Sequence, residues 1–523
     1  MKQVLKIKNL SILFLLVLVS GCGFKQNNSE NNTTIPQISK VFQSVDCTQF
    51  HLSRSDIECG YLEVPNDYFE KTTTYSLPVV IKKAVNNLEN LSPIIYIEGG
   101  PGGSALDNTD SYLSSLEHFT NRDVILYDQR GTGYSDPFLT CDDIFENYNK
   151  LINEKWTELN EQNITKYTIT QNQYDINFQQ LTKEKYDSCA ESLSAKEQAP
   201  KYFTTRNSAY DIESLRESLG YDKIILLGAS YGTRLSLEYM EILPQNLETV
   251  ILDGVLPENS DLLNNAITEK KDAISRYLEV CKNDITCNSA YPNFEDELFV
   301  ITDALTKNSH QFITIENNIT IYHTTTGSDI FQKFFDLLYT SYYYDKLPYY
   351  IHNIYTDIQN DKYSYLEYLS ALYSDTVNND DPLRSNVMNA FISRNDHPLS
   401  INDMLSNYQS LGRYQNSTSI YNIFNWNDMH ISYGGIDKLI EHTYDSNVPT
   451  LLLSGTLDPI TPVHYGENVA HRLPNSTHLI FQNQGHVQFR SECGKLTIKT
   501  FIDNNDSFIP PDCVNDDNKI DFL

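Results

Sequence analysis

Short apolar runs, each followed by glycine or by polar residues, recur along the 523-residue chain. The first two, 60–64 and 75–82, predict strands that open a sheet in antiparallel fashion. Later runs predict short buried strands that end in loops containing glycine or aspartate, at residues 93–97, 123–127, 224–227, 249–252 and 450–453. Helical stretches separate these strands, so we expect an α/β fold with a doubly wound, mostly parallel sheet.

Two long stretches interrupt this alternation of strands and helices. Residues 138–205 are polar and helical in pattern. Residues 257–440 show helical periodicities, no clear sheet motif and many tyrosines, which at helical spacing are more typical of half-buried packing than of a binding site. We therefore expect a core formed by residues 41–256 and 441–523, with 257–440 as a helical cap over the carboxyl edge of the sheet.

The N-terminus has the pattern of an export signal. Lysines precede an apolar run, 12–19, that is far shorter than the roughly 20 residues needed to cross a bilayer. The run ends in VSGC, which resembles a bacterial lipobox, in which the cysteine is lipidated. We expect residues 1–21 to be a lipoprotein signal peptide and 22–40 a flexible tether, so that Cys22 anchors an exported bacterial protein to a membrane. The alternative is an ordinary secretory cleavage site.

Cysteine usage fits an exported protein. Apart from Cys22, the chain has an even number of cysteines, which indicates a disulfide framework in such a protein. The simplest connectivity pairs nearest neighbours, namely Cys47 with Cys59, Cys141 with Cys189, Cys281 with Cys287 and Cys493 with Cys513. No pair has the C-x-x-C spacing of a zinc or redox site, so we expect neither a metal nor a cofactor.

The composition limits the partners of the folded chain. Its 40% of hydrophobic residues suit a soluble globular protein. The formal net charge of −30 argues against nucleic acid and anionic membrane surfaces, because both would repel it. We attribute the charge to a well-solvated surface, and the oligomeric state stays open.

One serine stands where a predicted strand gives way to a helix. The strand 224–227 runs into Gly228-Ala229-Ser230-Tyr231-Gly232, and a helical segment, 235–243, follows. This G-x-S-x-G arrangement is that of a nucleophile elbow, whose tight turn requires small residues beside the serine. We therefore predict Ser230 as a nucleophile. The backbone N–H of Tyr231 and one from the glycine loop 99–103, at Gly100, are the predicted oxyanion donors.

The nucleophile needs a general base, and the base needs an acid that orients it. In this class of fold the chain order is serine, acid, histidine. His486 fits the base because it follows the apolar segment 479–481, a plausible last strand, and stands next to a glycine. Asp458 fits the acid because it follows strand 450–453, whereas Asp253, which also ends a strand, is the alternative.

Several segments resemble prolyl and tripeptidyl aminopeptidases, which are exported α/β-hydrolase serine peptidases. The motifs occur in the same order as in those enzymes: CGYLEVPNDY at 59–68, GGPGGS at 99–104, DQRGTGYS at 128–135, GASYGTR at 228–234, LDGV at 252–255, GTLDPITP at 455–462 and GH at 485–486. The resemblance implies an α/β-hydrolase fold with Ser230, Asp458 and His486 as nucleophile, acid and base. It also implies that the enzyme releases residues or short peptides from free N-termini, often with a preference for proline.

An aminopeptidase must also neutralise the free ammonium group of its peptide substrate. We expect carboxylates of the cap to do this, and Glu98, beside the glycine loop, is a second candidate for which a structural role is the alternative. Glu98 also departs from the resemblance, because many prolyl iminopeptidases have histidine there. Two other functions stay open from the sequence: an esterase with the same triad, and a binding lipoprotein that kept the fold without the activity.

Overall fold

A computed structural model describes most of the chain: residues 42–70, 73–85, 91–144, 146–147, 151, 184–185, 187–261, 265–316, 319–377, 383–397, 406–417, 446–504, 507–516 and 518–523. The expected signal peptide, Cys22 and the tether lie outside these residues, so lipidation stays a prediction. Within the described ranges, no helix is both long enough and apolar enough to span a membrane.

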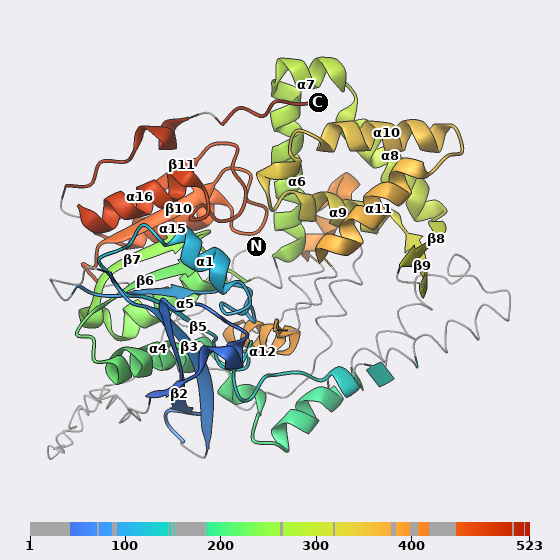
Figure 1. The fold of residues 1–523 in the computed structure, drawn as a ribbon. Helices are drawn as coiled ribbons and strands as arrows, with labels where there is room; N and C mark the ends of the chain where they lie inside the picture. The colour runs from blue at the N-terminus through green and yellow to red at the C-terminus, as the bar shows by residue number, and fades with distance from the viewer. Residues whose placement is uncertain are drawn as a thin grey trace, which may run out of the picture. The chain divides into compact units, whose positions relative to one another are not determined.

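Nine strands form one mixed sheet (Figure 1), in the order β1-β2-β3-β5-β4-β6-β7-β10-β11. The strands are β1 (Phe42–Val45), β2 (Ile57–Pro65), β3 (Thr74–Lys82), β4 (Ile94–Ile97), β5 (Val124–Tyr127), β6 (Ile224–Ala229), β7 (Leu247–Asp253), β10 (Thr450–Gly455) and β11 (Ser476–Phe481). The pairs from β1 to β5 are antiparallel, and those from β5 to β11 are parallel. The predicted doubly wound, mostly parallel sheet is confirmed, and β1 is an additional strand that the sequence pattern did not indicate.

The inner strands β4, β5 and β6 are buried on both faces of the sheet. Ile95 and Ile97 of β4 belong to one hydrophobic cluster, whereas Ile94 and Tyr96 belong to another on the opposite face. The first cluster includes residues of α4 (Thr205–Leu219), α5 (Tyr231–Ile242) and α15 (Val463–Arg472), and the second includes residues of α1 (Thr109–Ser115) and α16 (Glu492–Asp503). A strand that is covered on both faces is an unbroken apolar run, which is why the sequence pattern located these strands.

The segment between β7 and β10 is mainly helical and has a hydrophobic cluster of its own. Its helices are α6 (Ala266–Asn283), α7 (Ile285–Ala290), α8 (Phe294–Lys307), α9 (Gly327–Leu337), α10 (Leu347–Gln359), α11 (Ser364–Val377) and α12 (Asn386–Asp396). The expectation that this segment contains no sheet is wrong, because β8 (His310–Glu316) and β9 (Ile319–Thr325) form an antiparallel pair. Isoleucine and threonine are frequent there, and β-branched residues favour strands.

Helix α12 departs from the expected boundary between cap and core. Its Val387, Met388, Phe391 and Ile392 belong to the hydrophobic cluster of the sheet and not to that of the other cap helices. Short 3₁₀ turns complete the described elements: η1 (Cys47–Phe50), η2 (Pro200–Tyr202), η3 (Pro244–Asn246), η4 (Ser341–Tyr343), η5 (Gly412–Ser417) and η7 (Asp512–Asn515).

Four disulfides fasten the described chain. They are Cys47–Cys59, Cys141–Cys189, Cys281–Cys287 and Cys493–Cys513, the nearest-neighbour pairs expected from the sequence. The second closes the polar insertion between β5 and α4, the third lies within the cap, and the fourth joins α16 to η7. These disulfides are consistent with an exported protein, because such bonds persist in oxidising compartments.

Candidate active site

Ser230 lies at the sharp turn between β6 and α5. Its backbone φ of 55° and ψ of −122° are strained for a residue with a side chain. The glycines on each side are sterically required: a methyl group on Gly228 would lie 2.3 Å from Gly232 O, and one on Gly232 would lie 2.2 Å from Ile97 O. The G-x-S-x-G sequence therefore folds into the tight elbow that was expected from it.

The carboxylate of Asp458 is fully buried in the turn that follows β10. Asp458 Oδ1 accepts hydrogen bonds from the N–H groups of Ile460 (2.9 Å) and Thr461 (2.8 Å), and Oδ2 accepts one from Thr461 Oγ1 (2.7 Å). These bonds fix both oxygens within the local turn. Asp458 is therefore an oriented acceptor that faces the loop after β11.

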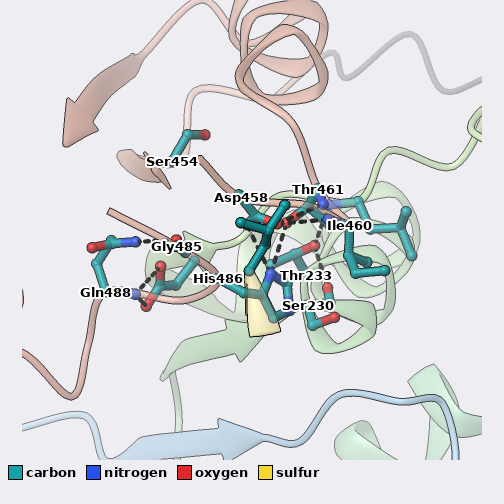
Figure 2. A network of polar contacts seen from close by, with 12 residues as sticks. Ser230, Thr233, Ser454, Asp458, Ile460, Thr461, Gly485, His486 and Gln488 are labelled. Atoms are coloured by element: carbon teal, nitrogen blue, oxygen red, sulfur yellow. Dashed lines mark hydrogen bonds and ion pairs between the residues drawn. The ribbon is translucent and has the colours of Figure 1, made fainter. Parts of the chain in front are cut away.

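His486 lies in that loop, beside Asp458. The distance from His486 Nδ1 to Asp458 Oδ2 is 2.7 Å (Figure 2). The backbone N–H of His486 donates to Tyr339 O of the cap at 3.1 Å. With the ionised carboxylate at Nδ1, the proton of a neutral imidazole resides on Nδ1, which leaves Nε2 as a base.

Thr461 is a polar neighbour of this pair that the sequence analysis did not single out. Its Oγ1 lies 2.7 Å from Asp458 Oδ2 and 3.1 Å from His486 Nδ1. The signal that could have found it is its place in GTLDPITP, three residues after the aspartate. Its hydroxyl donates to Asp458 and helps to keep that carboxylate in one orientation.

The pKa values of the pair shift in opposite directions. Burial disfavours charge on both groups, but each ion stabilises the other. The His486 pKa is raised because Asp458, with smaller effects from Asp253 and Glu98, outweighs burial. The Asp458 pKa is lowered because His486 and the hydrogen bonds from Thr461 outweigh burial. An ionised aspartate beside a histidine that can accept a proton suits general-base chemistry.

Ser230 and His486 are brought together by the end of β7. The Ser230 N–H donates to Asp253 O at 2.9 Å, and a methyl group on the next residue, Gly254, would lie 3.0 Å from His486 Cε1. Among the described residues, Ser230 Oγ makes no hydrogen bond to His486. Catalytic hydrogen bonds are often long or misaligned before substrate binds, so this geometry remains compatible with proton transfer.

Asp253, the alternative acid, has a different set of partners. Its carboxylate accepts the N–H groups of Gln488 (2.8 Å) and Phe489 (2.6 Å), two and three residues after His486. Burial raises the Asp253 pKa to about 7. Asp253 thus holds the histidine loop, whereas Asp458 holds the imidazole.

The glycine loop 99–103 lies against the serine. A methyl group on Gly99 would be 2.8 Å from Ser230 Cβ and 3.4 Å from Ser230 Oγ, and Gly100 has a φ of +116° that favours glycine. Tyr231 begins α5, where amide groups have no partner within the helix. These positions suit the predicted oxyanion donors, Tyr231 and Gly100, whose role stays a prediction.

Helix α12 supports the far side of this loop. The N–H of Ser385, the residue that caps the helix, donates to Gly102 O at 2.9 Å. Asn389 Nδ2 donates to Pro101 O at 3.0 Å. The inserted segment therefore helps to fix the glycine loop, a contact that no local sequence pattern indicated.

Glu98 is tied to the protein through both carboxylate oxygens. Oε1 accepts the N–H of Gly99 at 2.8 Å, and Oε2 accepts the hydroxyls of Tyr96 (3.1 Å) and Tyr112. Arg490 Nη2 in turn donates to the Tyr112 hydroxyl at 2.9 Å. These contacts favour the structural role for Glu98 over the binding of a substrate ammonium group. No group of three or more His, Cys, Asp or Glu side chains in the described ranges is placed to hold a metal ion.

Comparisons with known proteins agree with this architecture. A family model for the α/β-hydrolase fold matches residues 92–279, which include Ser230, and a model for TAP-like proteins matches residues 424–507, which include Asp458 and His486. The chain has the α/β-hydrolase fold, and both matches support a hydrolase.

Curated relatives with peptidase names match part of the chain at low identity. The serine protease Hip1 of Mycobacterium tuberculosis is 25% identical over 259 residues, 47% of each chain. The tripeptidyl aminopeptidase of Streptomyces coelicolor is 28% identical over 41% of this chain and 38% of its own. The proline iminopeptidase of Neisseria gonorrhoeae is 25% identical over 33% of this chain and 37% of its own. The matches thus span less than half the length of each relative.

Proposed function

We propose that the chain is a serine aminopeptidase that releases N-terminal residues or short peptides through an acyl-enzyme on Ser230. The observation that carries the proposal is the 2.7 Å contact between His486 Nδ1 and Asp458 Oδ2 beside a serine held at a strained elbow. The peptidase names of the relatives that match this chain support the choice of substrate.

The proposed reaction starts with neutral His486, whose Nε2 takes the proton of Ser230 as its Oγ attacks the carbonyl carbon. Asp458 keeps the imidazole in the tautomer that this step needs and stabilises the imidazolium that forms. The backbone N–H groups of Tyr231 and Gly100 stabilise the oxyanion. His486 then gives the proton to the leaving amine, and water hydrolyses the acyl-enzyme by the same route.

For the recognition of a free N-terminus, the candidate carboxylate of the cap is Asp336, which precedes a residue that contacts His486. Asp336 lies in the last turn of α9, three residues before Tyr339, whose ring centroid lies 5.7 Å from that of His486. Gln332 donates to Asp336 Oδ1 at 2.7 Å. Burial raises the Asp336 pKa to about 6 in spite of Lys270 and Lys333 nearby, so an ammonium ligand would stabilise the charged form. We therefore assign the ammonium contact to Asp336 in preference to Glu98.

The proposed function is tested with two substrates that differ only at the amino end, one with a free amine and one N-acetylated, on the same chromogenic leaving group. A charge-assisted contact should favour the free amine by about 10-fold or more in kcat/KM. Asp336→Asn should reduce that preference, and Asp361→Asn, an exposed cap aspartate, should keep it. Equal cleavage of both substrates would replace the aminopeptidase by the esterase alternative.

The nucleophile is tested on the same protein. Ser230→Ala should abolish both hydrolysis and labelling by a fluorophosphonate, because it removes the attacking hydroxyl while the fold is kept. Full labelling of the variant on another serine would show that Ser230 is not the nucleophile. Absence of labelling in the wild-type protein would favour the binding lipoprotein without activity.

A further inference from the structure

A groove lies behind the acid loop, between α6, the turns that follow β10 and β11, and the C-terminal segment. Its volume is about 500 Å³, a size typical of small-molecule sites. Charged side chains come from α6 and the C-terminal segment, and the apolar wall is formed by Val280, Leu457, Ile520 and Phe522. Neither Ser230 nor His486 is among the described residues that line it, so the groove is distinct from the candidate active site.

Arg276, on the groove wall, has more donors than partners. Its Nη2 donates to the backbone carbonyl of Asp458 at 2.8 Å. Its Nε is buried and has no hydrogen-bond partner in the described part of the chain. Burial lowers the Arg276 pKa, and the nearby carboxylates of Asp458 and Glu269 raise it by less. The positive charge of Arg276 is therefore only partly stabilised by its neighbours. Because Nε is enclosed by protein, a ligand in the groove would meet the remaining Nη donors, of which only the one to Asp458 O has a described partner.

The groove is lined by two cations and two acids, which differ in their partners. Lys519 is exposed at the groove and makes no ion pair with a described residue. The two acids have partners: Glu279 forms an ion pair with Lys282 at 3.5 Å, and Asp284 caps α7 by accepting the N–H of Cys287 at 2.8 Å. The groove therefore holds two cations, Arg276 and Lys519, that form no ion pair with a described residue, although the chain as a whole has a formal charge of −30.

We propose that this groove binds a small carboxylate that carries an apolar side chain, such as the C-terminal end of a short peptide or an acylated amino acid. Its carboxylate contacts Arg276 and Lys519, and its side chain packs on Leu457 and Phe522. A guanidinium group suits carboxylates because its fork of donors matches their geometry. Since the same guanidinium donates to the Asp458 carbonyl, occupancy of the groove acts on the acid of the candidate triad.

The binding test uses the full chain with Ser230→Ala, so that it does not depend on the proposed function. N-acetyl-L-leucine is titrated calorimetrically against N-acetyl-L-leucinamide, which has the same side chain without the carboxylate. The acid should bind saturably and the amide should not. Lys519→Gln should weaken binding of the acid by about 10-fold or more. Lys362→Gln, which removes an exposed cap lysine outside the groove, should leave the affinity unchanged.

Equal binding of acid and amide, no saturable binding, or equal affinities of the Lys519→Gln and Lys362→Gln variants would overturn the proposal. In the active enzyme, N-acetyl-L-leucine should change kcat at saturating substrate, Lys519→Gln should remove that effect, and Lys362→Gln should keep it. An unchanged kcat would overturn the coupling to Asp458. A chain that cleaves no peptide would count against the proposed function alone, because the calorimetric comparison is made on an inactive variant.

Discussion

The negative charge around His486 comes from carboxylates that end or follow different strands of the sheet. Asp458 and Asp253 follow β10 and end β7, and Glu98 follows β4; all three raise the His486 pKa against the effect of burial. From the cap, Tyr339 contributes a backbone carbonyl to the His486 N–H and a ring against the imidazole, and Arg276 donates to the Asp458 carbonyl. The pKa of His486 therefore depends on charged residues from several loops.

A general base must be neutral, so hydrolysis is lost as the pH falls through the His486 pKa. This acid limb should lie above 6.5, the ordinary value for histidine, because the pKa is raised. Glu98→Gln removes one of the negative charges, lowers the His486 pKa and should move the acid limb of kcat/KM to lower pH. A pH–rate profile measures the shift, with Glu241→Gln, on the exposed side of α5, as the control. Superimposable profiles for both variants would contradict this electrostatic role.

At the scale of elements, helix α12 decides how closely the glycine loop is held. Its capping residue, Ser385, is packed directly on Gly102: a methyl group there would lie 2.2 Å from Ser385 O. Gly102 also has a φ of +94°, which favours glycine. The loop beside Ser230 is thus shaped jointly by its own glycines and by a helix almost 300 positions later in the chain.

Gly102→Ala should separate the glycine loop from α12. It should reduce kcat by more than the loss of folding stability would explain. The matched control is Gly220→Ala at the end of α4, where φ is +76° and no atom lies within 4 Å of the added methyl group. Gly220→Ala should lower the free energy of unfolding only by the cost of a side chain at positive φ, about 1–2 kcal/mol. Gly102→Ala should in addition lose up to about 10²-fold in kcat if an oxyanion donor moves. Thermal unfolding and steady-state kinetics of both variants measure the two effects, and a wild-type kcat for Gly102→Ala would rule out the coupling.

At the scale of the whole molecule, the cap contributes contacts to the candidate site. Two residues of the candidate triad contact it, through Tyr339 O and Arg276. The C-terminal segment adds a second connection, since the Leu523 N–H donates to Asp345 O at 3.1 Å and the Tyr291 hydroxyl donates to Leu523 O at 2.6 Å. Displacement of the cap would therefore disturb His486 and Asp458 of the candidate triad.

The location of the molecule depends on Cys22, which we predict to be lipidated. Cys22→Ser should remove the acyl anchor, so the protein should be either uncleaved or released from the membrane fraction. Mass spectrometry of the wild-type N-terminus should find a diacylglyceryl cysteine, with the other eight cysteines of the chain oxidised. A wild-type N-terminus without lipid would contradict the lipoprotein, and the disulfides would then point to simple secretion.

The sequence by itself determined the features that depend on residues close together in the chain. Buried strands are apolar runs, so the positions of β4, β5, β6, β7 and β10 followed from hydrophobicity alone. The elbow followed from two glycines that a tight turn requires, and Asp458 and His486 were chosen because loops at strand ends face one edge of a parallel sheet. The nearest-neighbour cysteine pairs are close in sequence, and the structure forms the same pairs.

Tertiary structure decided what depends on residues far apart in the chain. The choice between Asp458 and Asp253 rests on which carboxylate reaches the imidazole, and both stand at strand ends in the sequence. The bonds of Tyr339 and Arg276 to the histidine and acid loops, and of Ser385 to the glycine loop, join positions more than 100 residues apart. No hydrophobic period encodes such a contact, because each is specified by how helices of the inserted segment pack on the sheet, which only the folded chain determines.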